Sequence, residues 1–318
     1  PNLFESDVAE TTRVLVDTYT DSDIPSEGHV TLTYDIECEM DSGLPDVEKS
    51  ENELTAIGLH DSATDHYWVL IMDKAGKMSE KKTGNRTVIP FRDERDMCMK
   101  YLELYEYINP TIVTGWNIDN FDTPYLYNRI KRLLGVKHAN RLSPIGECFW
   151  SPYRKRFYMA GVSYLDYLAL YKNFTYSELD NYRLDSIAMK ELGRGKIEYA
   201  GNLDDLFKDD IEKFIEYNLV DVELVVEFDQ KLQFIDTARG ICHAGHRQRD
   251  HHRKRAFFSW TRVSPRFPHM GPPFERWSRI STALSRPRNM ARLGDLANRF
   301  ERQLPGRWLA RCIRSQKP

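Results

Sequence analysis

The 318-residue sequence lacks a long hydrophobic run, a paired-cysteine motif and an N-terminal signal. No run of about 18 apolar residues is present, which excludes a membrane-spanning helix of the usual length. The five cysteines are scattered, a usage typical of reduced thiols rather than of a disulfide framework. The first residues include neither an initiator methionine nor a basic-then-apolar pattern, so we expect a piece of a longer chain.

Charge is distributed unevenly along the chain. Residues 247–318 contain 16 arginines and two lysines against four acidic residues, a net charge of +14, whereas residues 1–246 carry −17. All 17 tyrosines lie before residue 247. This change in composition predicts a boundary near His246, followed by an irregular or disordered tail.

Two interpretations of this tail compete. A basic arm could grip nucleic-acid phosphates, because such arms gain affinity by releasing counterions. Alternatively, the tail could be an out-of-frame continuation rather than a selected sequence. We favour the second interpretation, because lysine is nearly absent, no strand pattern is present, and Pro265, Pro268 and Pro287 interrupt any long helical period.

The first 246 residues show strand and helix patterns in alternation. Five segments predict strands: residues 30–38, 54–59, 66–72, 111–114 and 162–165. Five segments predict helices: residues 94–107, 125–134, 166–171, 183–192 and about 30 residues from position 203 onward. Residues 146–161 predict a hairpin. This order indicates an α/β fold, with a mixed sheet covered by helices.

The first acidic cluster is Asp35-Ile36-Glu37, in the first predicted strand. Side chains alternate along a strand, so Asp35 and Glu37 point to the same face, about 7 Å apart. Alone, this pattern is more typical of the solvated face of an edge strand. However, Val30, Leu32 and Ile36 are typical of a central strand, where buried carboxylates need a cation to offset their desolvation.

The second acidic cluster ends at Asp122, directly before a predicted helix. Thr123 is predicted as the N-cap and Pro124 as the first helical residue, which leaves Asp122 free to point toward a site. Asn117 and Phe121 flank it, one an amide that can hydrogen-bond and the other a ring on which a base could stack. Alone, an Asn/Asp-rich loop is a weak signal.

The third cluster lies on the long predicted helix, where Phe214, Tyr217, Asp221, Leu224 and Phe228 share one stripe. A carboxylate in an apolar stripe is costly unless something pairs with it. Tyr217 and Asp221 can present a hydroxyl and a metal ligand to one point, although a structural Tyr–Asp network is the alternative. Four residues off the stripe predict a solvated face: Glu212, Glu216, Glu223 and Glu227.

Carboxylates delivered from separate elements can hold two divalent cations against a phosphodiester, which points to a nuclease. The three clusters together resemble the Exo I, Exo II and Exo III motifs of the DEDD exonuclease superfamily, in the subtype with tyrosine in the third motif. Their context resembles family B DNA polymerases, particularly those of T-even-type bacteriophages. Four further segments carry this resemblance: residues 91–97, 114–118, 142–146 and 165–168.

The resemblance implies a ribonuclease-H-like fold, with a mixed five-stranded sheet and a hairpin insertion, and 3′→5′ proofreading activity. It divides the chain into a remnant of the family's N-terminal region (1–29), an exonuclease domain (30–246) and an Arg-rich tail unlike the family (247–318). The polymerisation signatures Asp-x-x-Ser-Leu-Tyr-Pro-Ser and Tyr-Gly-Asp-Thr-Asp-Ser are absent. We therefore expect no primer extension by this chain.

The resemblance also implies roles for individual residues. Asp35, Glu37 and Asp221 match the metal ligands, Asp122 matches the residue that binds a second ion, and Tyr217 would orient the attacking water. The implied cofactors are two Mg²⁺ or Mn²⁺ ions, which would activate that water and stabilise the leaving oxygen. Candidate nucleic-acid contacts are Asn117, Phe121, Arg154, Lys155 and Arg156.

The implied partner is the single-stranded 3′ end of primer-template DNA. The parent protein is expected to work with a sliding clamp and a replisome in the cytoplasm, that of the host if the source is viral. Two alternatives stay open: a non-catalytic nucleic-acid-binding fragment whose basic tail supplies affinity, and an exonuclease of the same superfamily that acts on RNA.

Overall fold

The computed structural model describes residues 28–41, 43–152, 156–175, 178–199 and 201–244. The Arg-rich tail and the first 27 residues lie outside this part of the chain. Residues 28–234 form one compact unit, and residues 235–244 belong to a second one. None of the helices in the described part is long and apolar enough to cross a membrane.

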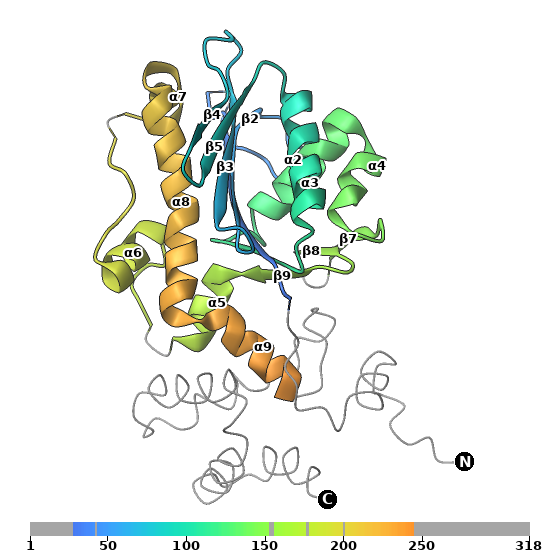
Figure 1. The fold of residues 1–318 in the computed structure, drawn as a ribbon, viewed down its shortest axis with the longest axis vertical. Helices are drawn as coiled ribbons and strands as arrows, with labels where there is room; N and C mark the ends of the chain where they lie inside the picture. The colour runs from blue at the N-terminus through green and yellow to red at the C-terminus, as the bar shows by residue number, and fades with distance from the viewer. Residues whose placement is uncertain (1–27, 42, 153–155, 176–177, 200, 245–318) are drawn as a thin grey trace, which may run out of the picture. The chain divides into compact units, whose positions relative to one another are not determined.

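A seven-stranded mixed sheet forms the centre of residues 28–234 (Figure 1), in the order β4-β5-β3-β2-β1-β6-β9. Its strands are β1 (Thr31–Cys38), β2 (Leu54–Asp61), β3 (His66–Met72), β4 (Lys81–Thr83), β5 (Arg86–Phe91), β6 (Ile112–Gly115) and β9 (Ser163–Asp166). The central strand β1 runs antiparallel to β2 and parallel to β6. All five predicted strands are therefore confirmed, within a mixed sheet.

The sheet is larger than the five strands that the resemblance implies. Beyond β3, the parallel strand β5 and the short antiparallel strand β4 extend the edge. Gly84 makes the turn between them with a positive φ of 60°. Proline usually argues against a strand because it lacks an N–H, but Pro90 lies beyond the residues of β5 that pair with β4.

Helices cover both faces of this sheet (Figure 1). α2 (Glu94–Ile108) and α3 (Asp122–Leu134) pack on one face, and α8 (Ile211–Leu232) packs across β1, β2 and β3 on the other. The shorter helices are α4 (Val136–Ala139), η1 (Asn140–Leu142), α5 (Tyr167–Phe174), α6 (Leu184–Leu192) and α7 (Leu203–Asp209). α9 (Phe234–Ala244) follows α8. The strands β7 (Cys148–Ser151) and β8 (Arg156–Met159) form the predicted hairpin.

The alternation of β1 separates the core from the acidic side chains. Leu32, Tyr34 and Ile36 belong to the core that includes the buried residues of α2 and α3. Asp35 and Glu37 lie on the opposite face, which α8 covers. One strand thus supplies both a hydrophobic core and a row of carboxylates, as its period of two predicts.

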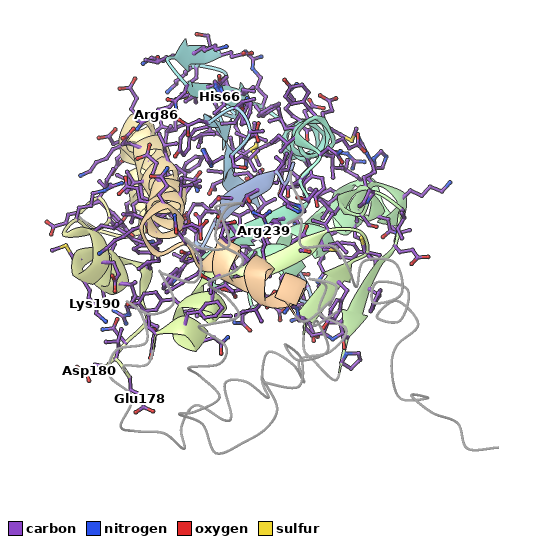
Figure 2. The ribbon with its side chains drawn as sticks, turned by 60° about the horizontal axis from the view of Figure 1, so that its bottom comes forward. His66, Arg86, Glu178, Asp180, Lys190 and Arg239 are labelled. Atoms are coloured by element: carbon purple, nitrogen blue, oxygen red, sulfur yellow. The ribbon has the colours of Figure 1, made fainter. Side chains whose placement is uncertain are left out.

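The long predicted helix is divided into α7 and α8 at Asp210. Asp210 caps α8, and its side chain accepts a hydrogen bond from the backbone N of Lys213 at 3.0 Å. The predicted stripe of α8 is buried along its whole length. The opposite face is not fully solvated: Arg86, labelled in Figure 2, reaches from β5 to Glu216 and Glu223.

Arg129 of α3 forms a buried ion pair with Glu94 at the start of α2. Its Nη2 lies 2.5 Å from Glu94 Oε2, and its Nε donates to Oε1 at 2.8 Å. Nη1 donates to the carbonyl oxygens of Ser50 and Glu51, at 3.0 and 2.8 Å. The pair therefore ties both helices to the segment that precedes β2.

We expect Arg129→Ala to lower the free energy of unfolding by about 3–5 kcal/mol, because it leaves the Glu94 carboxylate buried without its cation. Arg132→Ala is the matched control on the same helix, since Arg132 is half exposed and its ion pair with Glu51 spans 3.6 Å. Such surface pairs contribute about 0–1 kcal/mol. Urea denaturation measures both losses, and equal losses would contradict this account of the α2–α3 face.

Candidate active site

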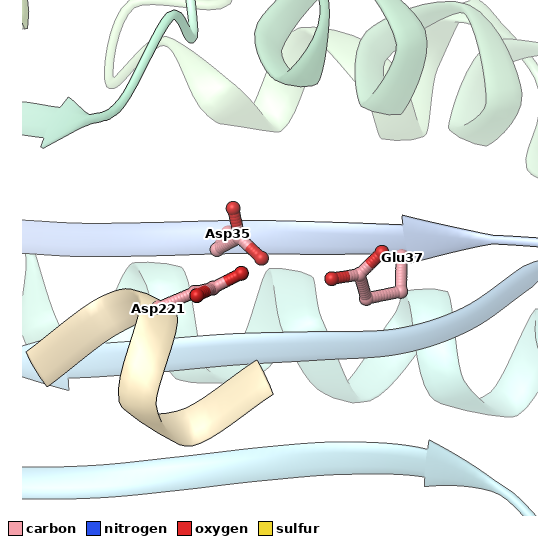
Figure 3. Close-up of side chains that lie close together, drawn as sticks. All are labelled: Asp35, Glu37 and Asp221. Atoms are coloured by element: carbon pink, nitrogen blue, oxygen red, sulfur yellow. The ribbon is translucent and has the colours of Figure 1, made fainter. Parts of the chain in front are cut away.

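Three carboxylates meet between β1 and α8 (Figure 3). Asp35 and Glu37 project from β1, and Asp221 projects toward them from α8. One oxygen of each side chain lies within 4.8 Å of the others. Asp221 is buried at 2% exposure, whereas the two residues of β1 are half-buried. The structure thus brings together the first and third acidic clusters.

Asp122 lies beside this group of three without joining it. It is the first residue of α3 and is 5% exposed. Its Oδ1 accepts a hydrogen bond at 3.2 Å from the backbone N of Ile36, which separates the two acidic residues of β1. The predicted N-cap was wrong: the helix begins at Asp122, two residues earlier than predicted, and the Thr123 hydroxyl bonds to the Tyr34 hydroxyl at 2.6 Å instead.

Lys196 places a cation against the third cluster. Its Nζ lies 2.6 Å from Asp221 Oδ2, and it donates to the Tyr217 hydroxyl at 2.9 Å. Tyr217 itself is buried. Lys196 was missed in the sequence because it lies outside any helix or strand, where no periodicity relates it to α8.

Asp166 organises the loop that leads to Asp122. Its buried carboxylate accepts hydrogen bonds from the backbone N of Asn117 at 3.1 Å and of Asp119 at 3.2 Å. The same carboxylate caps α5 through the backbone N of Leu168 at 2.9 Å. Asn117 adopts a left-handed φ of 67°, a conformation that asparagine tolerates better than most residues. The second cluster is therefore a shaped loop, held by β9.

Arg156, one of the predicted nucleic-acid contacts, is buried. Its Nη2 lies 3.0 Å from Asp119 Oδ1 and donates to the carbonyl oxygen of Tyr164 at 3.1 Å. Asp119 neutralises the charge of Arg156, and this ion pair joins β8 of the hairpin to the loop of the second cluster. Arg154 and Lys155 lie outside the described residues.

Phe121 is half-buried, and its ring stacks on that of Tyr125, with the ring centroids 5.3 Å apart. The side chain of Asn117 accepts a hydrogen bond from Asn120 Nδ2 at 2.7 Å. Both predicted contact residues thus lie on the loop beside Asp122, where they have partners inside the protein. Their contacts with nucleic acid stay predictions.

Burial and mutual repulsion shift the carboxyl groups of this site toward their protonated forms. Burial, followed by the charge of Asp221, raises the pKa of Glu37 to about 8. Burial raises the pKa of Asp122 to about 7, against the hydrogen bond from Ile36. Burial and Glu37 raise the pKa of Asp35 well above its usual value. Burial also raises the pKa of Asp221, although Lys196 opposes this shift.

The donor set fits a divalent cation. The second oxygen of Asp221, Oδ1, is buried and has no hydrogen-bond partner among the described residues. Leaving a buried carboxylate oxygen unpaired is costly, and a cation would relieve both this cost and the repulsion among the carboxylates. Hard oxygen ligands of this kind suit Mg²⁺ and Mn²⁺. Asp35, Glu37 and Asp221 could therefore hold such an ion.

A second acidic group comprises Glu39, Asp41 and Asp204. Asp41 already pairs with Lys208, and both oxygens of Asp204 accept the backbone N of Met40. These carboxylates are satisfied by the protein, so we assign no ion to them.

Comparison with known proteins identifies the family. Residues 3–187 match the family described as DNA polymerase family B, exonuclease domain. The chain therefore belongs to this family, and its mixed sheet flanked by helices is the ribonuclease-H-like exonuclease fold. The resemblance inferred from the three motifs is confirmed.

The chain is similar to several whole polymerases. It is 36% identical over 229 residues to the DNA-directed DNA polymerase of Enterobacteria phage T4, covering 64% of this chain and 25% of that protein. It is 33% identical over 232 residues to that of Escherichia phage RB69, covering 64% and 26%. DNA polymerase 1 of Sulfurisphaera ohwakuensis is 25% identical over 217 residues, covering 65% and 23%. The chain thus spans about a quarter of the length of these relatives.

The raised pKa values predict how metal-free stability depends on pH. Carboxyl groups of the unfolded chain titrate near pH 4, as in model peptides, whereas Glu37 has a pKa of about 8 in the folded protein. Between these values the folded state binds more protons than the unfolded state, so stability falls as pH rises through this window. Ligands must be deprotonated to bind metal, so Mg²⁺ should restore most stability near pH 8.

Thermal unfolding in a chelator between pH 5 and 8 tests this expectation. Glu37→Gln removes one of the titrating groups and should flatten the decline, whereas Glu106→Gln, at a surface pair with Arg141, should follow the parent chain. Parallel curves for the parent chain and the Glu37 variant would contradict the assigned cause.

Proposed function

We propose that this chain is the metal-dependent 3′→5′ exonuclease module of a family B DNA polymerase. The observation that carries the proposal is the convergence of Asp35, Glu37 and Asp221 within 4.8 Å, with one oxygen of Asp221 buried and unpaired among the described residues. Asp122, at the start of α3, lies beside them and accepts a hydrogen bond from the backbone N of Ile36 in β1. Such an acidic group is suited to phosphodiester hydrolysis through divalent ions.

The proposed substrate is the last phosphodiester of a single-stranded DNA 3′ end. Water adds to the phosphorus, the bond to the 3′-oxygen of the preceding nucleotide breaks, and that oxygen takes up a proton. The products are a deoxynucleoside 5′-monophosphate and a strand one nucleotide shorter. When bound, Mg²⁺ or Mn²⁺ supplies Lewis-acid stabilisation of the charge that develops on phosphate and acidifies a bound water.

The protein groups would divide the remaining work. Asp35, Glu37 and Asp221 would hold one ion, and Asp122 would contribute to holding a second. The Tyr217 hydroxyl accepts a hydrogen bond from Lys196, which would orient it to donate its own proton to the attacking water or to a phosphate oxygen. Lys196 keeps its charge near neutral pH, because Asp221 and Tyr217 raise its pKa against the effect of burial.

The proposal assigns this activity to residues 30–246, with residues 1–29 and the Arg-rich residues 247–318 as flanking segments. A sliding clamp, a replisome and a cytoplasmic location stay predictions for a protein of polymerase length. The relatives of phages T4 and RB69, which are DNA-directed DNA polymerases, support DNA rather than RNA as the substrate.

Digestion of a 3′-labelled single-stranded oligonucleotide tests the proposal. Asp35→Ala and Asp221→Ala should each lower the rate more than about a hundredfold, because losing a ligand costs at least as much as losing an outer-shell partner. Glu106→Gln should digest at the parent rate, since that carboxylate lies on the surface beside Arg141. An unchanged metal-dependent rate in both aspartate variants would refute the assignment.

Two further arms separate the alternatives. An RNA oligonucleotide of the same sequence should be digested more slowly than DNA; the opposite preference would favour an RNA-directed exonuclease. Deleting residues 247–318 should leave hydrolysis intact. Loss of DNA binding in that deletion, with no hydrolysis by either form, would favour the non-catalytic binding fragment.

Lys196→Met should lower kcat about tenfold or more, as expected for an outer-shell partner. The variant keeps a long side chain but removes the donor that orients Tyr217 and neutralises Asp221. Lys190→Met is the control, because that half-exposed lysine pairs with Glu191 away from the carboxylates. Single-turnover digestion measures both variants, and equal rates would exclude Lys196 from the reaction.

A further inference from the structure

Asn218 of α8 contacts the site from within the protein. Its side chain is fully buried, and its Nδ2 donates to Asp35 Oδ2 at 3.0 Å. The other amide atom, Oδ1, has no hydrogen-bond partner among the described residues. The amide is therefore satisfied on only one side, and that side is Asp35.

Gly58 of β2 makes room for this amide. It lies opposite Asp35 in the pairing of β1 with β2. A Cβ atom at this position would lie 2.5 Å from Asn218 Oδ1 and 3.0 Å from Val222 Cγ2. The glycine thus lets the Asn218 side chain lie over the strand, next to the carboxylate of Asp35.

Packing alone does not account for an asparagine here. Burying an amide oxygen without a partner is unfavourable, and leucine has a similar shape without that disadvantage. The feature that leucine lacks is the N–H donor to Asp35. This donor is neutral, so it fixes one carboxylate oxygen without cancelling the negative charge, unlike Lys196, which pairs with Asp221.

We infer that Asn218 is a positioning residue, which holds Asp35 in the orientation that binds a divalent cation. The inference rests on the metal-dependent exonuclease proposed above. Partners that orient ligands in this way typically change metal affinity by about 10–100-fold when they are removed. Gly58 is the complementary requirement, because it allows Asn218 to approach.

Calorimetric titration of the chelator-treated full chain with Mn²⁺ tests the inference without any nucleic acid. Asn218→Leu should weaken Mn²⁺ binding about tenfold or more. Val222→Ala is the matched control, because Val222 also packs against Gly58 from α8 but makes no hydrogen bond to Asp35. It should bind Mn²⁺ as the parent chain does. Circular dichroism establishes that each variant is folded, and Asn218→Ala replaces Asn218→Leu should the latter not fold.

Parent-like affinity in the Asn218 variant would overturn the inference, and so would equal weakening in Val222→Ala, which would assign the effect to packing. Asp35→Ala separates this failure from a failure of the proposed function. If Asp35→Ala loses Mn²⁺ binding and the Asn218 variant retains it, only the inference about Asn218 fails and the proposed function stands. Unchanged Mn²⁺ binding in Asp35→Ala would contradict the assignment of the metal site, and therefore both proposals.

Discussion

Repulsion among Asp35, Glu37 and Asp221 is the constraint on which the site depends. Folding brings their oxygens to within 4.8 Å of one another, and burial disfavours the ionised form of each carboxyl group. Lys196 offsets only part of this cost, since it pairs with Asp221. Hydrophobic packing on both faces of the sheet holds these mutually repelling carboxylates together. A divalent cation would offset the repulsion and would find its ligands already in place.

The two faces of β1 have different roles: one packs in the hydrophobic core, and the other carries the carboxylates. The face toward α2 and α3 contributes Leu32, Tyr34 and Ile36 to the core, which fixes the strand in position. The other face presents the carboxylates to α8, whose own position depends on apolar residues such as Phe214 and Leu219. Asp122 is joined to the same strand by a backbone hydrogen bond. A small shift of either layer would therefore change the spacing of the ligands.

Local periodicity accounts for what the sequence could predict. The alternation of β1 and the apolar stripe of α8 predict the correct faces for Asp35, Glu37 and Asp221. The strand β5 was missed, since Pro90 obscured its pattern. The break at Asp210 was missed because the apolar spacing continues across it. Lys196 could not be found in this way, because its contacts with α8 arise only from tertiary structure.

The central claim is that the three converging carboxylates form a divalent-cation site. Anomalous diffraction from crystals soaked in Mn²⁺ tests it most directly. The account predicts a manganese peak bounded by Asp35, Glu37 and Asp221, within about 2.0–2.6 Å of their oxygens, the range of hard-cation–oxygen distances. A fully occupied peak elsewhere, for example at Glu39, Asp41 and Asp204, with none between β1 and α8, would contradict it.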